Sequence, residues 1–144
     1  MAEQLYWEDV TEGSEIKTLV KHPTPRQLVM YAGASGDYLE IHYNNEFALS
    51  RGLPGIIVHG QLSCHFLGQL VTDWIGSEGM LKKISCTYRG MNFPGEDLTC
   101  RGKVTRKHAQ DGEHLVECNI WAENPRGEKT VLGSATVTLP ARAS

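Results

Sequence analysis

Apolar residues recur along the chain with two different periods, which divide it into a helical middle and a stranded second half. Between residues 62 and 75, apolar side chains repeat every four residues with further apolar residues beside them. Side chains four residues apart share one face of an α-helix, so this stripe predicts a well-buried central helix of about five turns, ended by Gly76 to Gly79. The positions concerned are Leu62, Phe66, Leu67, Leu70, Val71, Trp74 and Ile75.

In the second half, apolar residues occupy every second position in four runs. This period is typical of strands that bury one face. Turn-forming segments at 92–95, 110–112 and 124–127 separate the runs, so they predict consecutive antiparallel strands. The alternating positions are Ile84, Cys86 and Tyr88; Leu98, Cys100, Gly102 and Val104; Val116, Cys118, Ile120 and Ala122; and Val131, Gly133, Ala135, Val137 and Leu139.

The first 60 residues predict shorter elements. Residues 16–20 form a short strand, and Thr24-Pro25 is a favourable helix start, because threonine caps a helix and proline suits its first position. That helix ends at Ser35-Gly36, and a second short helix opens at Asn44 or Asn45. The fold class is therefore α+β, with an antiparallel sheet of about five strands around one long helix. A chain of 144 residues forms a single domain, 1–144.

Composition excludes several classes of function. A net charge of −3 and a pI near 6.0 give no broad electrostatic surface for nucleic acid or an anionic membrane. No apolar stretch approaches the ~18 residues of a membrane span, and the N-terminus lacks the pattern of a secretory signal. The four cysteines are widely spaced without a CxxC pair, so we expect no disulfide framework and no zinc site. These features favour a cytoplasmic protein.

A carboxylate and an imidazole that suit acid–base chemistry follow the first helix. Asp37 and His42 are five residues apart in a turn that Gly36 makes flexible, so their side chains can converge on one small volume. Imidazole titrates near neutrality, and a neighbouring carboxylate can orient it or hold a water molecule. The alternative is that Asp37 caps a turn and His42 is an ordinary surface or core residue.

A second patch lies at the start of the long helix, over Val58-His59-Gly60-Gln61. Backbone N–H groups in the first helical turn have no internal partner and point outward at the positive end of the helix dipole. A glycine there allows close approach of a ligand carbonyl, so the Gly60 amide is a candidate oxyanion donor. The alternative is that Gly60 only caps the helix and His59 is a loop residue.

The two patches together resemble the MaoC-like dehydratases. Segment 31–48 is similar to the hydratase-2 motif of that family, in which an aromatic residue precedes Gly-Asp-x-Asn-Pro, an aliphatic residue, His and, after five residues, Ala. The resemblance extends over about 6–140. The matching residues are Ser35-Gly36-Asp37, Ile41-His42 and Ala48, the run Gly52-Leu-Pro-Gly-Ile-Ile-Val-His-Gly60, and Phe93-Pro94-Gly95-Glu96-Asp97-Leu98.

This resemblance implies a hotdog fold and an (R)-specific enoyl-CoA hydratase that needs no metal or redox cofactor. Asp37 and His42 would be catalytic, Gly60 would be the oxyanion donor, and acyl-CoA would bind near a subunit interface. A homodimer or higher homo-oligomer is expected, with a hetero-oligomer as the alternative. The substrate-binding candidates at the start of the helix are Ile57, His59, Gln61 and Ser63. The candidate cations for CoA phosphates are Lys82, Lys83, Arg89, Arg101, Lys103 and Arg106.

The chain departs from the family motif at one place, where Leu39-Glu40 replaces Asn-Pro. Leu39 cannot form the hydrogen bond by which the Asn orders the catalytic turn, and we expect Glu40 to face solvent. Two alternative functions remain open. One is a thioesterase on the same scaffold, which would release free CoA. The other is an acyl-binding, non-catalytic subunit that completes a hetero-oligomeric hydratase.

Overall fold

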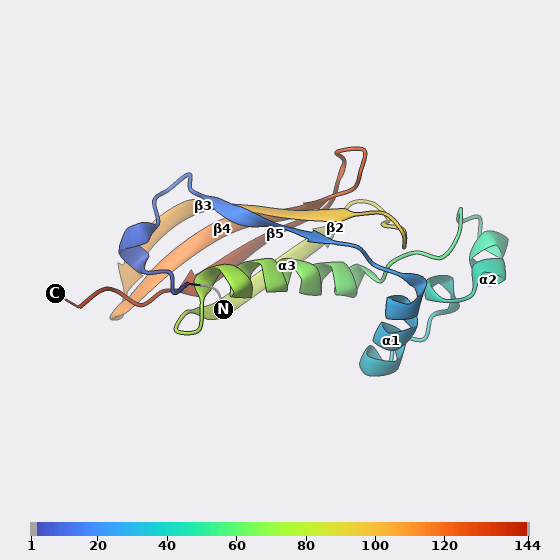
Figure 1. Cartoon of the computed structure of the whole chain (residues 1–144), viewed down its shortest axis with the longest axis horizontal. Helices are drawn as coiled ribbons and strands as arrows, with labels where there is room; N and C mark the ends of the chain where they lie inside the picture. The colour runs from blue at the N-terminus through green and yellow to red at the C-terminus, as the bar shows by residue number, and fades with distance from the viewer. Residues whose placement is uncertain (1–2, 144) are drawn as a thin grey trace.

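The computed structural model describes residues 3–143, with one long helix lying against a curved antiparallel sheet (Figure 1). The helices are the 3₁₀ helices η1 (Trp7–Asp9) and η2 (Glu40–His42) and the α-helices α1 (Pro25–Ser35), α2 (Asn45–Ser50) and α3 (Gly60–Ile75). The strands are β1 (Glu15–Lys21), β2 (Met80–Tyr88), β3 (Leu98–Gln110), β4 (Glu113–Glu123) and β5 (Lys129–Thr138). Within residues 3–143, no helix is both long and apolar enough to cross a membrane.

The five strands form one sheet in the order β1-β3-β4-β5-β2, and every neighbouring pair is antiparallel. This arrangement confirms the predicted α+β class, the number of strands and the central helix. The strand β3 continues to Gln110, well past the alternating positions, because its last residues pair with β4 outside the buried core. Asp111 (φ 51°) and Gly112 (φ 78°) make the turn between these two strands.

The core is the contact between α3 and the inner face of the sheet. Of the predicted helix stripe, only Trp74 is half-buried, and the other six residues are buried. Each fully buried side chain of this size contributes roughly 1.5–3 kcal/mol relative to exposure, so the stripe is a main source of stability. The buried residues facing it from β3, β4 and β5 are Leu98, Cys100, Val104, Val116, Cys118, Ile120, Ala122, Val131, Ala135 and Val137.

Two short helices hold the loop that carries the candidate catalytic residues, and Figure 1 shows both projecting beyond the end of α3. As predicted, α1 begins at Pro25, with the Thr24 hydroxyl accepting a hydrogen bond from the Gln27 amide at 3.2 Å. It ends at Gly36 (φ 78°), a left-handed conformation that favours glycine. The cap of α2 is Asn44, whose side-chain oxygen accepts from the Phe47 amide at 3.1 Å. Residues 37–43 are therefore fixed at both ends.

The close approach of β5 to β2 at Gly133 gives a test of the sheet. A Cβ at residue 133 would lie 2.5 Å from the carbonyl oxygen of Ser85, so Gly133→Ala must displace a backbone and should destabilise the protein by about 1–3 kcal/mol. The matched control is Gly68→Ala in α3, where a Cβ meets nothing within 4 Å and should stabilise the helix by roughly 0.5–1 kcal/mol. Urea unfolding measures both changes. Equal midpoints for the two variants would contradict this packing.

Candidate active site

Asp37 lies at the start of the loop between α1 and α2, in a turn stabilised by its own side chain. The Asp37 amide donates to Ser35 Oγ at 3.1 Å, and Asp37 Oδ1 accepts from the Leu39 amide at 3.3 Å. Side chains of Asp commonly form such local bonds two residues along the chain. The carboxylate is 47% exposed and its second oxygen, Oδ2, is left to face His42.

His42 is held in one orientation by the main chain of the next segment. Its Nδ1 lies 2.8 Å from the carbonyl oxygen of Ile57, which can only accept, so Nδ1 carries the proton and donates. Its Nε2 therefore holds the lone pair and lies 3.8 Å from Asp37 Oδ2. This separation is too long for a direct hydrogen bond, and the imidazole is 7% exposed. The arrangement presents a base and a carboxylate to the same point.

His59 is buried directly behind His42. The two rings stack with centroids 3.8 Å apart and an interplanar angle of 21°, and the Tyr31 ring packs against His59 in a T-shaped arrangement with centroids 4.7 Å apart. His59 Nε2 faces the carbonyl oxygen of Asp37 at 3.4 Å. Burial, and secondly the nearby His42, lower the pKa of His59 below its ordinary value of 6.5. A neutral His59 therefore forms a rigid wall behind the pair.

The set Asp37, His42 and His59 also offers three potential metal ligands, whose ligand atoms lie within 4.8 Å of one another. Their orientation does not suit a metal ion. A histidine nitrogen binds a metal such as zinc along its lone pair, in the plane of the ring, at about 2.0–2.1 Å. Because the two imidazoles are stacked, their lone pairs lie in nearly parallel planes 3.8 Å apart at the ring centroids and do not converge on one ion. The geometry favours acid–base work over metal binding.

A cavity of about 230 Å³ opens beside His42 and reaches the first turn of α3. Gly60 is the first residue of α3, where amide groups have no acceptor within the helix. A Cβ at this position would lie 3.3 Å from the Tyr88 ring, so glycine lets Tyr88 lie close over the helix start. The lining residues are His42, Ile57, Val58, Gly60, Ser63, Tyr88, Gly90, Met91, Asn92 and Val131.

Three residues proposed from the sequence at this helix start, Ile57, Gly60 and Ser63, line the cavity together with His42. Gln61 is exposed and is not among the lining residues, and His59 lies behind His42 rather than in the wall. Asp37 is not among the residues that line the cavity. Its carboxylate lies beside His42, with Oδ2 3.8 Å from His42 Nε2.

Sequence reasoning missed the wall contributed by the end of β2 and the turn that follows it. Asn92 is buried, its carbonyl accepts from the Val58 amide at 2.8 Å, and its side-chain nitrogen donates to Ser63 Oγ at 3.4 Å. Tyr88 and Met91 form the rest of this wall. The sequence marks Asn92 only as the first residue of a turn, and no local pattern shows that this turn meets the start of α3.

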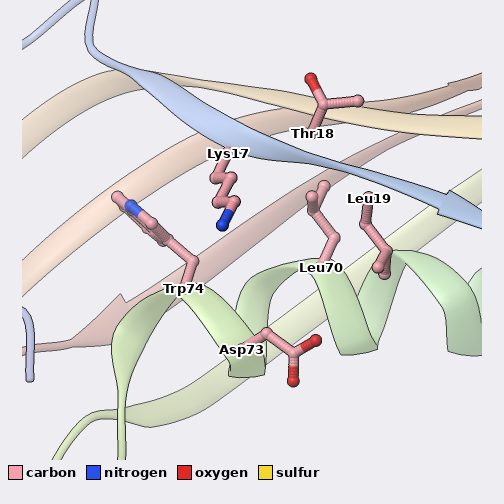
Figure 2. Close-up of a pocket in the computed structure, with 6 residues that line it drawn as sticks. All are labelled: Lys17, Thr18, Leu19, Leu70, Asp73 and Trp74. Carbon is pink, nitrogen blue, oxygen red and sulfur yellow. The ribbon is translucent and has the colours of Figure 1, made fainter. Parts of the chain in front are cut away.

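A second hollow lies between β1 and the opposite end of α3 (Figure 2). Figure 2 shows Lys17 of β1 pointing toward α3 between Trp74 and Leu70. At 1.5 Å per residue, Asp73 and Trp74 are about 20 Å along the helix from Gly60. The residues lining this hollow include neither a histidine nor a cysteine, so the site beside His42 is the stronger candidate for catalysis.

Comparison with known proteins identifies the family of the chain. Residues 8–124 match the family model of the MaoC like domain. The chain belongs to this family. The MaoC-like family includes (R)-hydratases, so membership supports a hydratase or dehydratase in general.

Individual relatives range from small proteins to parts of very large ones. The chain is 35% identical over 116 residues to the fatty acid synthase subunit beta of Aspergillus oryzae, covering 78% of this chain but only 6% of that protein. It is 26% identical over 132 residues to the 3-oxo-4,17-pregnadiene-20-carboxyl-CoA hydratase beta subunit of Mycobacterium tuberculosis, covering 92% of this chain and 97% of that one. The structure of R-hydratase PhaJ1 from Pseudomonas aeruginosa matches with a TM-score of 0.88 and 20% identity, over 98% of this chain and 89% of that one. This likeness confirms the hotdog fold.

The lowered pKa of His59 predicts how stability depends on pH. Below pH 6.5 the imidazole of His59 is protonated in the unfolded chain but not in the folded chain. The free energy of unfolding therefore falls as the pH drops from 6.5 toward the lowered pKa of the folded state, and above pH 6.5 the effect vanishes. His59→Phe, which keeps an aromatic ring, should lose less unfolding free energy than the wild type between pH 7.5 and 5.5. Urea titrations at both pH values measure this. The exposed His65→Gln is the control, and an unchanged pH slope in His59→Phe would contradict the assignment.

Proposed function

We propose that this protein catalyses the reversible hydration of a trans-2-enoyl-CoA to an (R)-3-hydroxyacyl-CoA. The observation that carries the proposal is the placement of His42 Nε2 3.8 Å from Asp37 Oδ2, beside a cavity that reaches the first amide of α3. Two groups that can exchange protons and one group that can stabilise an oxyanion are what addition of water to an α,β-unsaturated thioester requires. Membership of the MaoC-like family supports the same reaction class.

In the proposed mechanism a water molecule lies between Asp37 and His42. At a separation of 3.8 Å, a water oxygen to one side of the line joining His42 Nε2 and Asp37 Oδ2 is within hydrogen-bonding distance of both groups. As this oxygen bonds to C3 of the substrate, its proton passes to the Asp37–His42 pair and the electrons of the C2–C3 double bond move into an enolate. The pair then returns a proton to C2. Dehydration of the hydroxyacyl thioester is the same path in reverse.

The enolate oxygen is the thioester oxygen, which in this scheme accepts a hydrogen bond from the Gly60 N–H. A donor in this role commonly lowers such a barrier by about 3 kcal/mol. The dipole of α3 adds to the effect, because its positive end lies at Gly60. All these groups belong to the chain itself, and the scheme needs no metal or redox cofactor.

For the CoA phosphates we propose Arg89 as the first cationic contact. It is exposed and lies in sequence between Tyr88 and Gly90, which both line the cavity. Half of the cations suggested by the sequence already pair with carboxylates of β4: Lys82 with Glu113, Arg101 with Glu123, and Arg106 with Glu117.

Removal of either catalytic group tests the proposal. Asp37→Asn and His42→Ala should each lower kcat for crotonyl-CoA hydration by about 100-fold or more, because each loses a proton-transfer group. The loss of enoyl-thioester absorbance measures the rate. The matched controls are Asp97→Asn and His22→Ala, which break an exposed carboxylate–imidazole pair with a 2.7 Å contact and should keep full activity.

A thiol assay on the same samples separates the two reactions of this scaffold. Release of free CoA from acyl-CoA without loss of the double bond would replace the hydratase by a thioesterase. Full hydration by both Asp37→Asn and His42→Ala would contradict the assignment of the pair.

We also propose that two copies of the chain assemble as a homodimer. The projecting region around α1 and α2 exposes apolar side chains of which Val29, Met30, Tyr38 and Leu39 are each more than half exposed, an unusual density for a surface in water. Within residues 3–143, the strand β2 is at the sheet edge and pairs with β5 alone, so its other edge is available for pairing. Sedimentation equilibrium of the purified chain should give twice the chain mass. A monomer that becomes active only with a homologous subunit would instead support a hetero-oligomer, as in the relative named a hydratase beta subunit.

A further inference from the structure

We propose that Glu40 is a positioning residue that holds His42 in place, so that a side-chain bond replaces the Asn-Pro of the family motif. This inference rests on the proposed hydratase function for its kinetic consequence. Its structural basis is independent of that function. The sequence predicted a solvent-facing Glu40, whereas in the structure this residue is half-buried and bonded.

Glu40 is joined to Asn44 twice. The Asn44 side-chain nitrogen donates to Glu40 Oε1 at 3.2 Å, and the Asn44 amide donates to the Glu40 carbonyl at 2.8 Å. Between these two residues lies His42, in the one-turn helix η2. The two bonds therefore close a short loop of main chain that includes His42.

The orientation of the Asn44 side chain makes an acceptor at Glu40 necessary. Its oxygen is already used as the cap of α2, accepting from the Phe47 amide at 3.1 Å. Its nitrogen must consequently point the other way, toward Glu40, and needs an acceptor there. The helix α2 is itself anchored by Ala48, which is fully buried. Glu40 thus ties the catalytic turn to an anchored helix.

Two further hydrogen bonds stabilise the same turn. The Tyr43 hydroxyl donates to the carbonyl oxygen of Tyr38 at 2.7 Å, and the amide of His42 donates to the carbonyl of Leu39 at 3.1 Å. The side chain of Leu39 is 55% exposed and can form no hydrogen bond. The ordering that Asn would supply at position 39 therefore comes from its neighbours at 40, 43 and 44.

The backbone at this place is also compatible with the family's proline. Leu39 has φ −62° and ψ 123°, an extended conformation of the kind that a residue before proline adopts. Glu40 is the first residue of η2, a position that proline favours. Leu39-Glu40 bonded to Asn44 is thus one way to stabilise this turn, and the family's Asn-Pro is another.

The expected kinetic effect is on kcat rather than on KM. The cavity wall at Gly60 and Ser63 belongs to α3, outside the turn that Glu40 stabilises. When the turn loosens, His42 Nε2 spends less time facing Asp37 Oδ2. Glu40→Ala should lower kcat for crotonyl-CoA roughly fivefold to tenfold, comparable to losing one hydrogen bond, with KM unchanged within about twofold.

Two further variants make the test specific. Glu40→Gln keeps an acceptor oxygen for Asn44 and should retain at least about half of the wild-type kcat. The double variant Leu39→Asn, Glu40→Pro installs the family pair and should recover most of the activity lost in Glu40→Ala. The matched control is Glu46→Ala on α2, which removes an exposed carboxylate and should leave kcat unchanged.

Amide hydrogen exchange without substrate separates this inference from the proposed function. Exchange at the amides of His42 and Asn44 should accelerate in Glu40→Ala but not in Glu40→Gln, whether or not the protein is a hydratase. Wild-type exchange rates in Glu40→Ala would overturn the inference. A kcat in Glu40→Gln as low as in Glu40→Ala would also overturn it, because the charge and not the hydrogen bond would then matter. An inactive wild type with the expected exchange pattern would leave the positioning bond in place and refute only the hydratase.

Discussion

The candidate site depends on three main-chain contacts of the extended pair Ile57-Val58. The Ile57 amide donates to the carbonyl of Ile41 at 3.1 Å, and the Ile57 carbonyl accepts from His42 Nδ1 at 2.8 Å. The Val58 amide donates to the carbonyl of Asn92 at 2.8 Å. One short segment thereby joins the catalytic turn to the end of β2. Because α3 begins two residues later and is buried along the sheet, the hydrophobic core fixes the position of all three parts.

The stacked imidazoles of His42 and His59 add an electrostatic constraint to these main-chain contacts. His42 and His59 are 3.8 Å apart and largely out of contact with water, so both cannot carry a proton at once without strong repulsion. His59 is the more deeply buried of the two rings and has the lowered pKa, in keeping with the proposed mechanism, which assigns proton transfer to His42. The Ile57 carbonyl fixes the tautomer of His42 and so determines which nitrogen faces Asp37. A buried neutral histidine thus has a role that a simple apolar wall would not supply.

The sequence predicted the helices and strands that hold the site better than it predicted the residues that line the cavity. Periods of four and two residues identified α3 and the strands because burial of one face dictates those periods, and Thr24-Pro25 identified the start of α1 through local capping. The contribution of Tyr88 and Asn92 could not be predicted, since it depends on where the end of β2 lies relative to Gly60 after the sheet has formed. The bond from Asn44 to Glu40 was missed for a different reason. An isolated glutamate is usually solvated, and only the geometry of η2 shows that Asn44 requires an acceptor at that point.

The groups that we propose for catalysis and the outer wall of the cavity lie on segments with different degrees of constraint. Asp37, His42 and Gly60 lie on short segments bonded to one another or to buried elements. Tyr88 and Met91, by contrast, come from the end of the edge strand β2 and the turn after it, and both are about half exposed. Side chains there can change size with little effect on the core, because about half of each is exposed. Under the proposed function, the wall that β2 provides is thus the place where the shape of the accepted acyl group can change while Asp37, His42 and Gly60 stay in position.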